Sequence, residues 1–142
     1  IDQDALRRRL ESTTVEALDN APGVVGYYSF GTLNVSGRGF AGVFNSPVLF
    51  DGIRYPGWQI APRSTLNYAQ VEVLRGPAGL SAGQGSVGGA INLVPQRADG
   101  VDDTRVYAGF GRFGTWTLGA GHGGAIGDDA ARYRVDATYQ AS

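Results

Sequence analysis

The segment VEVLRGPAGLSAGQGSVGGAINLVPQRA, residues 71–98, decides the fold, because it fits two enzyme signatures and also a pair of strands. Residues 79–83 (GLSAG) match G-x-S-x-G, the turn that carries the nucleophile of serine hydrolases. Residues 83–88 (GQGSVG) match G-x-G-x-x-G, the phosphate-binding turn of dinucleotide-binding proteins. Both signatures need a strand–turn–helix context, so the conformation of the following residues decides between them.

The residues on either side of these glycines predict strands. Residues 71–75 (VEVLR) alternate apolar and charged side chains, which is typical of a half-buried strand. Residues 90–94 (AINLV) predict a second strand, which ends at Pro95. A helix through the glycines of residues 83–89 would lose about 1 kcal/mol at each of them. The segment therefore favours two strands joined by a loop.

A serine hydrolase remains the alternative interpretation, with Ser81 as its nucleophile. Ser81, then Asp102 or Asp103, then His122 follow one another in the hydrolase order of nucleophile, acid and base. His122 lies in the glycine-rich run 119–124, which is a poor place to orient an imidazole. We interpret His122 as an exposed or interfacial residue near the end of a strand.

The dinucleotide interpretation also has one supporting residue. Asp103 lies about 20 positions after Gly83, where the fingerprint expects an acidic side chain that binds the ribose. The helix whose N-terminus would hold the pyrophosphate is missing, because Gly88 and Gly89 lead directly into β-branched residues. We therefore predict no dinucleotide site.

The composition excludes several classes of function. The 142 residues contain no Cys and one His, which excludes disulfides, Cys nucleophiles and His-rich or Cys-based metal sites. The net charge of -1 does not favour nucleic-acid binding, which needs a basic patch. Gly accounts for 23 of the 142 residues, well above its usual share of about 7% of a protein. This excess suits strands, bulges and tight turns.

The first 24 residues carry the helix signals. Asp2 predicts the N-cap of a helix over residues 3–10. Thr13 and Glu16 have the spacing of a capping box, which predicts a second helix that ends at Pro22-Gly23.

Short strands are predicted after the helices. Residues 24–28, 33–37 and 47–50 are apolar segments broken by Gly, Pro and Asn. Asp51-Gly52 separates residues 47–50 from residues 53–55 and predicts a tight hairpin turn.

The last third of the chain has a different pattern. Residues 116–120 (WTLGA) and 132–139 (RYRVDATY) each place apolar and aromatic side chains on one face and small or charged ones on the other. Such alternation is typical of a transmembrane β-barrel strand, and an amphipathic sheet edge in a soluble protein is the alternative. We expect strands over residues 105–110 and 115–122 and from residue 132, with turns at 111–114 and 127–129.

Residues 71–98 resemble the plug domain of TonB-dependent outer-membrane receptors. The matching elements are VEVLRGP at 71–77, the glycines at 83 and 85, GGAINLV at 88–94, and the basic residue at 97. Three further blocks match in family order: residues 15–24 (VEALDNAPGV), 36–40 (SGRGF) and 48–54 (VLFDGIR). The sequence departs from the family pattern at Ala82, where a Tyr is usual, and at 69–70 and 95–97.

The resemblance implies an α+β plug, with a small mixed sheet and short helices, over residues 1–99. Residues 100–142 would be the first antiparallel β-strands of a transmembrane β-barrel, truncated here because three strands cannot close. It implies active uptake of a bulky ligand, such as a ferric siderophore, cobalamin, haem or a saccharide. A surface adhesion or signalling barrel is a further alternative. The expected partners are the extracellular ligand, outer-membrane lipid, and TonB through a segment upstream of Ile1, with no nucleic acid.

The resemblance also implies roles for particular residues. Arg38, Tyr55, Trp58 and Gln59 are the candidate ligand contacts, although Arg38 could instead form an internal ion pair and Trp58 could pack on the barrel wall. Structural plug–barrel contacts are expected at Glu72, Arg75 and Arg97. No catalytic residue, metal or cofactor is implied, and the motif glycines are expected to serve backbone geometry.

Overall fold

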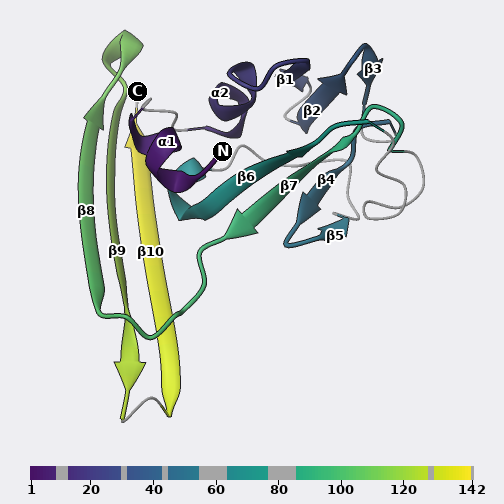
Figure 1. Cartoon of the computed structure of the whole chain (residues 1–142). Helices are drawn as coiled ribbons and strands as arrows, with labels where there is room; N and C mark the ends of the chain where they lie inside the picture. Colours follow the sequence, from purple (N-terminus) through teal and green to yellow (C-terminus); the bar gives the residue numbers. More distant parts are fainter. Residues whose placement is uncertain are drawn as a thin grey trace. The chain divides into compact units, whose positions relative to one another are not determined.

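The computed structural model describes residues 1–8, 13–29, 32–42, 45–54, 64–76, 86–127 and 130–141. The chain divides into two compact units, Ile1–Pro95 and Gln96–Ser142, each of which is described by itself (Figure 1). The elements of the first unit are α1 (Gln3–Arg8), α2 (Thr14–Asp19), β1 (Val24–Ser29), β2 (Thr32–Gly37), β3 (Phe40–Ala41), β4 (Val48–Phe50), β5 (Ile53–Arg54), η1 (Thr65–Asn67), β6 (Tyr68–Leu74) and β7 (Ala90–Pro95). Those of the second unit are β8 (Asp103–Phe110), η2 (Arg112–Gly114), β9 (Trp116–Ile126) and β10 (Ala131–Ala141).

Both helices begin at the predicted caps. The Asp2 carboxylate accepts a hydrogen bond from the backbone N–H of Ala5 at 2.7 Å. At α2 the Thr13 hydroxyl accepts from the Glu16 N–H at 3.3 Å, and the Glu16 carboxylate accepts from the Thr13 N–H at 3.0 Å. The capping box is therefore confirmed. The predicted end of the first helix, at residue 10, lies outside the described residues.

The first unit contains a mixed sheet of four strands in the order β5-β4-β7-β6, in which β4 and β7 run parallel. One face of this sheet carries Val71, Ile91 and Leu93, which are fully or almost fully buried. These side chains join the hydrophobic core that also contains Leu6 of α1 and Leu18 of α2. The predicted strands at 71–75 and 90–94 are thus confirmed as neighbours, and β6 begins three residues earlier than predicted because Tyr68 already pairs with Pro95.

The strands β1, β2 and β3 form a second, antiparallel sheet of the first unit. Leu33 and Val35 of β2 are buried in the same core. Helix α2 packs closely on β1, because a Cβ atom added to Gly26 would lie 3.1 Å from Cδ1 of Leu18. The short strand β3 was not predicted separately from the SGRGF block.

The second unit is an antiparallel sheet in the order β10-β9-β8. The prediction of alternating strands is confirmed, because Phe110 pairs with Trp116 and Leu118 pairs with Tyr139 on one face. The prediction that β9 ends near His122 is wrong, since β9 continues to Ile126. Backbone pairing of Gly123–Ile126 with β10 overrides the weak strand preference of glycine.

Among the residues that the structure describes, no helix is long and apolar enough to span a membrane.

Candidate functional site

The hairpin between β2 and β3 presents an arginine at its tip. Gly37 and Phe40 are paired, so Arg38 and Gly39 form a two-residue turn. Their φ values are 53° and 85°, as a type I′ turn requires, and an arginine rarely adopts such a φ. The backbone N–H of Arg38 donates to the Gly23 carbonyl at 3.0 Å, which ties the turn to the residue directly before β1.

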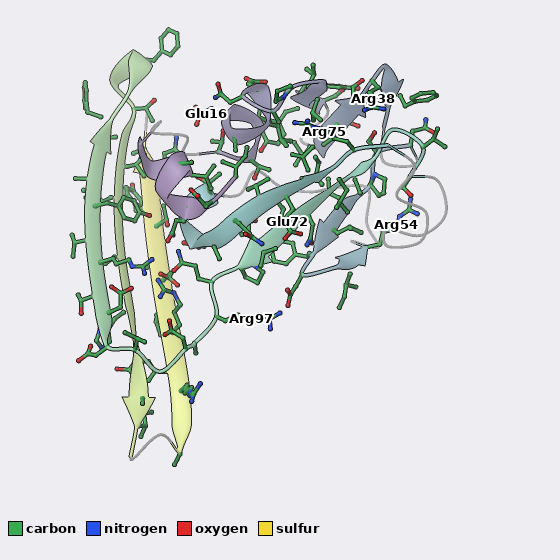
Figure 2. All side chains as sticks on the ribbon, in the orientation of Figure 1. Glu16, Arg38, Arg54, Glu72, Arg75 and Arg97 are labelled. Atoms are coloured by element: carbon green, nitrogen blue, oxygen red, sulfur yellow. The ribbon has the colours of Figure 1, made fainter. Side chains whose placement is uncertain are left out.

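The side chains of this hairpin are available to a ligand. Arg38 is exposed and forms no ion pair within the described part of the chain. Phe40 is 48% exposed, and Val87, which precedes β7, is 52% exposed. We call Arg38, Phe40 and Val87 the hairpin patch, and Figure 2 labels Arg38 at its place beside β3. The patch combines a permanent cation with apolar surface.

The second predicted hairpin turn is confirmed at Asp51 and Gly52, whose φ values are 51° and 82°. Gly52 N–H donates to the side-chain oxygen of Asn92 at 2.9 Å, which holds the turn against β7. Ile53 on β5 is 74% exposed. The other predicted ligand contacts, Tyr55, Trp58 and Gln59, lie outside the described residues.

A compact set of contacts joins the hairpin to the residues before β7. The buried Ser46 hydroxyl donates to the Phe40 carbonyl at 3.0 Å, and the Asn45 amide donates to the Ala41 carbonyl at 3.0 Å. The Asn45 carbonyl accepts from the Gly88 N–H at 2.9 Å. A Cβ atom on Gly37 would lie 2.2 Å from the Gly88 carbonyl oxygen. Sequence reasoning missed Asn45 and Ser46, since nothing local marks them.

The candidate structural contacts lie on or after the mixed sheet. The half-buried Glu72 carboxylate accepts from the Gln70 amide at 2.6 Å and from the Asn92 amide at 2.7 Å. Glu72 forms no ion pair within the described part of the chain. Arg75 and Arg97 are exposed, and Figure 2 labels Glu72, Arg75 and Arg97 at separate places along the chain.

One pKa in the first unit is perturbed. Burial raises the pKa of the Tyr28 phenol above its ordinary value, and the nearby Glu16 carboxylate raises it further. Both causes favour the neutral phenol. The shift belongs to the packing of β1 on α2 and not to a catalytic arrangement.

His122 is engaged within the second unit. Its Nδ1 lies 2.9 Å from the Thr104 hydroxyl, and its Nε2 lies 2.8 Å from the Tyr133 hydroxyl. Asp102 lies farther away, with its Oδ1 4.0 Å from Nδ1. Both ring nitrogens thus have partners on the neighbouring strands, and His122 is exposed but lies inside β9 rather than at its end. Ser81 lies outside the described residues.

The polar face of the second unit is organised around glycines of β9. The Tyr107 hydroxyl lies 2.7 Å from the Thr138 hydroxyl and reaches it across Gly119. Arg134 donates to both oxygens of Asp136, at 2.8 and 2.9 Å. Asp103 forms an ion pair with Arg105 and lies 3.7 Å from Arg134. The charges on this face therefore pair with one another, and Asp103 is not placed to bind a ribose.

The described residues also bear on the dinucleotide interpretation and on metal binding. Residues 86–89 lead directly into β7, so no helix begins after Gly88. No group of three or more His, Asp or Glu side chains suited to a metal ion occurs within the described ranges.

Comparison with known families and sequences gives a consistent result. Residues 1–90 match the TonB-dependent Receptor Plug Domain. The protein named "Probable TonB-dependent receptor BfrD" from Bordetella pertussis is 37% identical over 112 residues, or 72% of the chain. The catecholate siderophore receptor Fiu of Escherichia coli K12 is 32% identical over 111 residues, also 72% of the chain. The chain spans only 15% and 14% of these two relatives.

Solved structures show the same fold. The pyoverdine outer-membrane receptor FpvA of Pseudomonas aeruginosa PAO1 superposes with a TM-score of 0.86 over 99% of the chain, which covers 21% of FpvA, at 23% identity. The matching relatives are receptors, so the comparison does not favour the serine-hydrolase alternative. The chain therefore belongs to the family of TonB-dependent outer-membrane receptors, and its residues 1–90 are the plug domain.

Proposed function

We propose that the whole protein takes up a ferric siderophore across the outer membrane with energy delivered by TonB. The names of the relatives Fiu and FpvA support a siderophore over cobalamin, haem or a saccharide. The observation that carries the proposal is the hairpin patch, in which exposed Arg38, without an ion pair among the described residues, shares a hairpin with exposed Phe40. Siderophore complexes combine negative charge with apolar or aromatic groups, so this patch matches their chemistry.

Within this proposal Arg38 and Phe40 bind the ligand, together with Tyr55, Trp58 and Gln59. Arg38 supplies hydrogen-bond donors in a fixed planar arrangement, and Phe40 supplies apolar surface. Arg38 lies at the tip of the turn and is exposed, so its guanidinium is accessible. No covalent bond is made or broken, so these residues act only through reversible binding and release of the ligand.

The proposal is tested on the full-length receptor. Binding of an iron(III) tris-catecholate complex and of an iron(III) tris-hydroxamate complex is measured for the wild type, Arg38→Ala and Trp58→Ala. Loss of a hydrogen bond to a charged group costs about 1.5–3 kcal/mol, so we expect Kd to rise about 10- to 100-fold in Arg38→Ala. Unchanged affinity in both variants would overturn this site, and binding of neither complex would overturn the siderophore class.

Glu72, Arg75 and Arg97 are proposed to contact the barrel wall. Glu72 carries a half-buried negative charge that is held by two neutral amides and by no cation in the described part of the chain. A partly buried charge favours a partner of opposite sign, which the barrel would supply. We expect Glu72→Gln to weaken retention of the plug in urea, whereas Asp19→Asn, at an exposed carboxylate of α2, should not. Equal urea profiles for wild type and Glu72→Gln would contradict the role.

The apolar face of the second unit is proposed to face outer-membrane lipid. Val106, Leu118, Val135 and Tyr139 share this face and are 80%, 47%, 65% and 60% exposed. Aromatic pairs stand toward its two ends: the Trp116 and Tyr139 ring centroids are 5.3 Å apart, and those of His122 and Tyr133 are 5.6 Å apart. An apolar band between aromatic residues is the pattern of a membrane-facing barrel surface.

A further inference from the structure

We infer that Ser46, with Gly88, positions the hairpin that carries Arg38 and Phe40 and thereby sets the affinity for the ligand. This inference rests on the proposed function, since it assigns a role in binding to residues that do not touch the ligand. Ser46 is 2% exposed, so its hydroxyl can act only on the protein itself. Ser46 is therefore a positioning residue.

The Ser46 hydroxyl acts on the backbone of the hairpin. It donates to the carbonyl of Phe40, a residue of the patch, at 3.0 Å. The turn before Ser46 is held by its own backbone, because the N–H groups of Asn45 and Ser46 donate to the Gly42 carbonyl at 3.0 and 2.9 Å. Gly42 N–H in turn donates to Val35 of β2 at 3.1 Å. These bonds hold the backbone of Asn45 and Ser46 next to Gly42.

Gly88 closes the arrangement from the other side. Its N–H donates to the Asn45 carbonyl at 2.9 Å. A Cβ atom at this position would lie 2.5 Å from the Ser46 hydroxyl oxygen, 2.9 Å from the Gly37 carbonyl oxygen and 2.9 Å from Cβ of Phe40. Real Cβ atoms essentially never approach other atoms that closely, and two of these three neighbours lie on the hairpin. Only glycine allows the hairpin to lie directly on residues 86–89.

These contacts also connect the hairpin to the mixed sheet. The Pro47 carbonyl, directly after Ser46, accepts from the Ile91 N–H at 3.0 Å. Val48 follows and pairs with Ile91 in the parallel ladder of β4 and β7. The hairpin is therefore supported by the mixed sheet through Ser46, in addition to its own strands. The hairpin patch contains Phe40 of the hairpin and Val87 of residues 86–89. Its shape therefore depends on the contacts of Ser46 and Gly88 that hold these two segments together.

The first arm of the test needs no ligand. Amide hydrogen exchange is measured on the full-length receptor for wild type, Ser46→Ala and Gly88→Ala. Loss of one buried hydrogen bond is expected to speed exchange of the Gly42 and Gly88 amides about three- to tenfold in Ser46→Ala. The Val71 amide, bonded to the Ile1 carbonyl, should keep its rate. Wild-type rates at Gly42 and Gly88 in Ser46→Ala would overturn the positioning role.

The second arm measures binding of the iron(III) tris-catecholate and tris-hydroxamate complexes by the same proteins. Ser46→Ala should raise Kd about three- to tenfold for the complex that binds, while the urea midpoint of the plug falls no further than in a variant that loses another buried hydroxyl. The matched control is Thr14→Val, which removes another buried hydroxyl and should leave Kd unchanged. If Arg38→Ala weakens binding and Ser46→Ala does not, the inference fails while the proposed function stands. If neither complex binds the wild type, the ligand class fails and the exchange arm alone decides the inference.

Discussion

The ring of Tyr107 lies directly over Gly119, so that a Cβ atom on Gly119 would stand 1.8 Å from Cζ of Tyr107. This placement lets the Tyr107 hydroxyl cross β9 and reach Thr138 on β10 at 2.7 Å. A side chain at position 119 and the Tyr107 ring therefore exclude each other. Because Gly119 has no side chain, the Tyr107–Thr138 hydrogen bond can connect β8 to β10 across β9 on the polar face.

Gly119→Ala is expected to expel the Tyr107 ring and to break its hydrogen bond to Thr138. Overpacking of this kind costs about 1–3 kcal/mol of unfolding free energy, whereas Tyr107→Phe alone should cost about 0.5–1.5 kcal/mol. Urea unfolding of the receptor, followed by Trp116 fluorescence in a Trp58→Phe background, measures both. If Gly119→Ala is as stable as the wild type, the ring does not occupy this space.

Two glycines with positive φ should differ sharply in their tolerance of alanine. Gly52 has φ +82° and nothing within 4 Å of an added Cβ, so Gly52→Ala should cost only the conformational strain of about 1–2 kcal/mol. Gly89 has φ +105° and an added Cβ would lie 2.1 Å from the Leu74 carbonyl oxygen, so Gly89→Ala should cost clearly more. Urea midpoints of the plug give the comparison, and equal losses would contradict the steric difference.

The raised pKa of Tyr28 predicts that the unfolding free energy of the plug falls at alkaline pH. Its pKa in the folded state is raised by burial and by Glu16, above the value of about 10 in the unfolded chain. The stabilisation is fully present below pH 10 and is lost as pH rises through the folded-state pKa, because the unfolded state releases its proton first. Urea unfolding between pH 8 and 11 should show this decline in the wild type. The decline should be weaker in Tyr28→Phe, and identical pH profiles would refute it.

The receptor should not react as a serine hydrolase. A fluorophosphonate probe labels a serine only when a free base activates it, and both nitrogens of His122 are occupied by Thr104 and Tyr133. We expect no stoichiometric labelling in wild type, and uptake should persist in Ser81→Ala. Labelling that disappears in both Ser81→Ala and His122→Ala would reinstate the hydrolase interpretation.

Lipid contact of the second unit can be measured with Trp116. Trp116 lies on the apolar face beside Tyr139, and its own signal is the fluorescence difference between the full-length receptor and its Trp116→Phe variant. Reconstitution into vesicles of brominated phospholipid should quench its fluorescence strongly, since bromine quenches only nearby indoles. If this face does not contact lipid, brominated chains should leave Trp116 unquenched and aqueous iodide should reach it. That result would contradict the prediction.

The sequence by itself determined the features that depend on neighbours in the chain. The capping box of Thr13 and Glu16, the Asp51-Gly52 turn and the alternation along β10 each involve residues a few positions apart. Their geometry follows from local backbone preferences and side-chain periodicity, so pattern is sufficient to predict them. The ordered blocks that resemble the plug family extended this local information to the fold.

Only the tertiary structure decided which distant residues meet. Gly37 and Gly88 are in contact, and Ser46 holds Phe40, because the parallel pairing of β4 with β7 brings together segments about 40 residues apart. Likewise, Gly119 of β9 is explained by the hydrogen bond between Tyr107 and Thr138, which crosses it from the two flanking strands. A glycine in a sequence marks space or backbone freedom without saying which. The atoms that fill the space come from elsewhere in the fold, and so the positioning of the hairpin patch follows from packing and not from any local pattern.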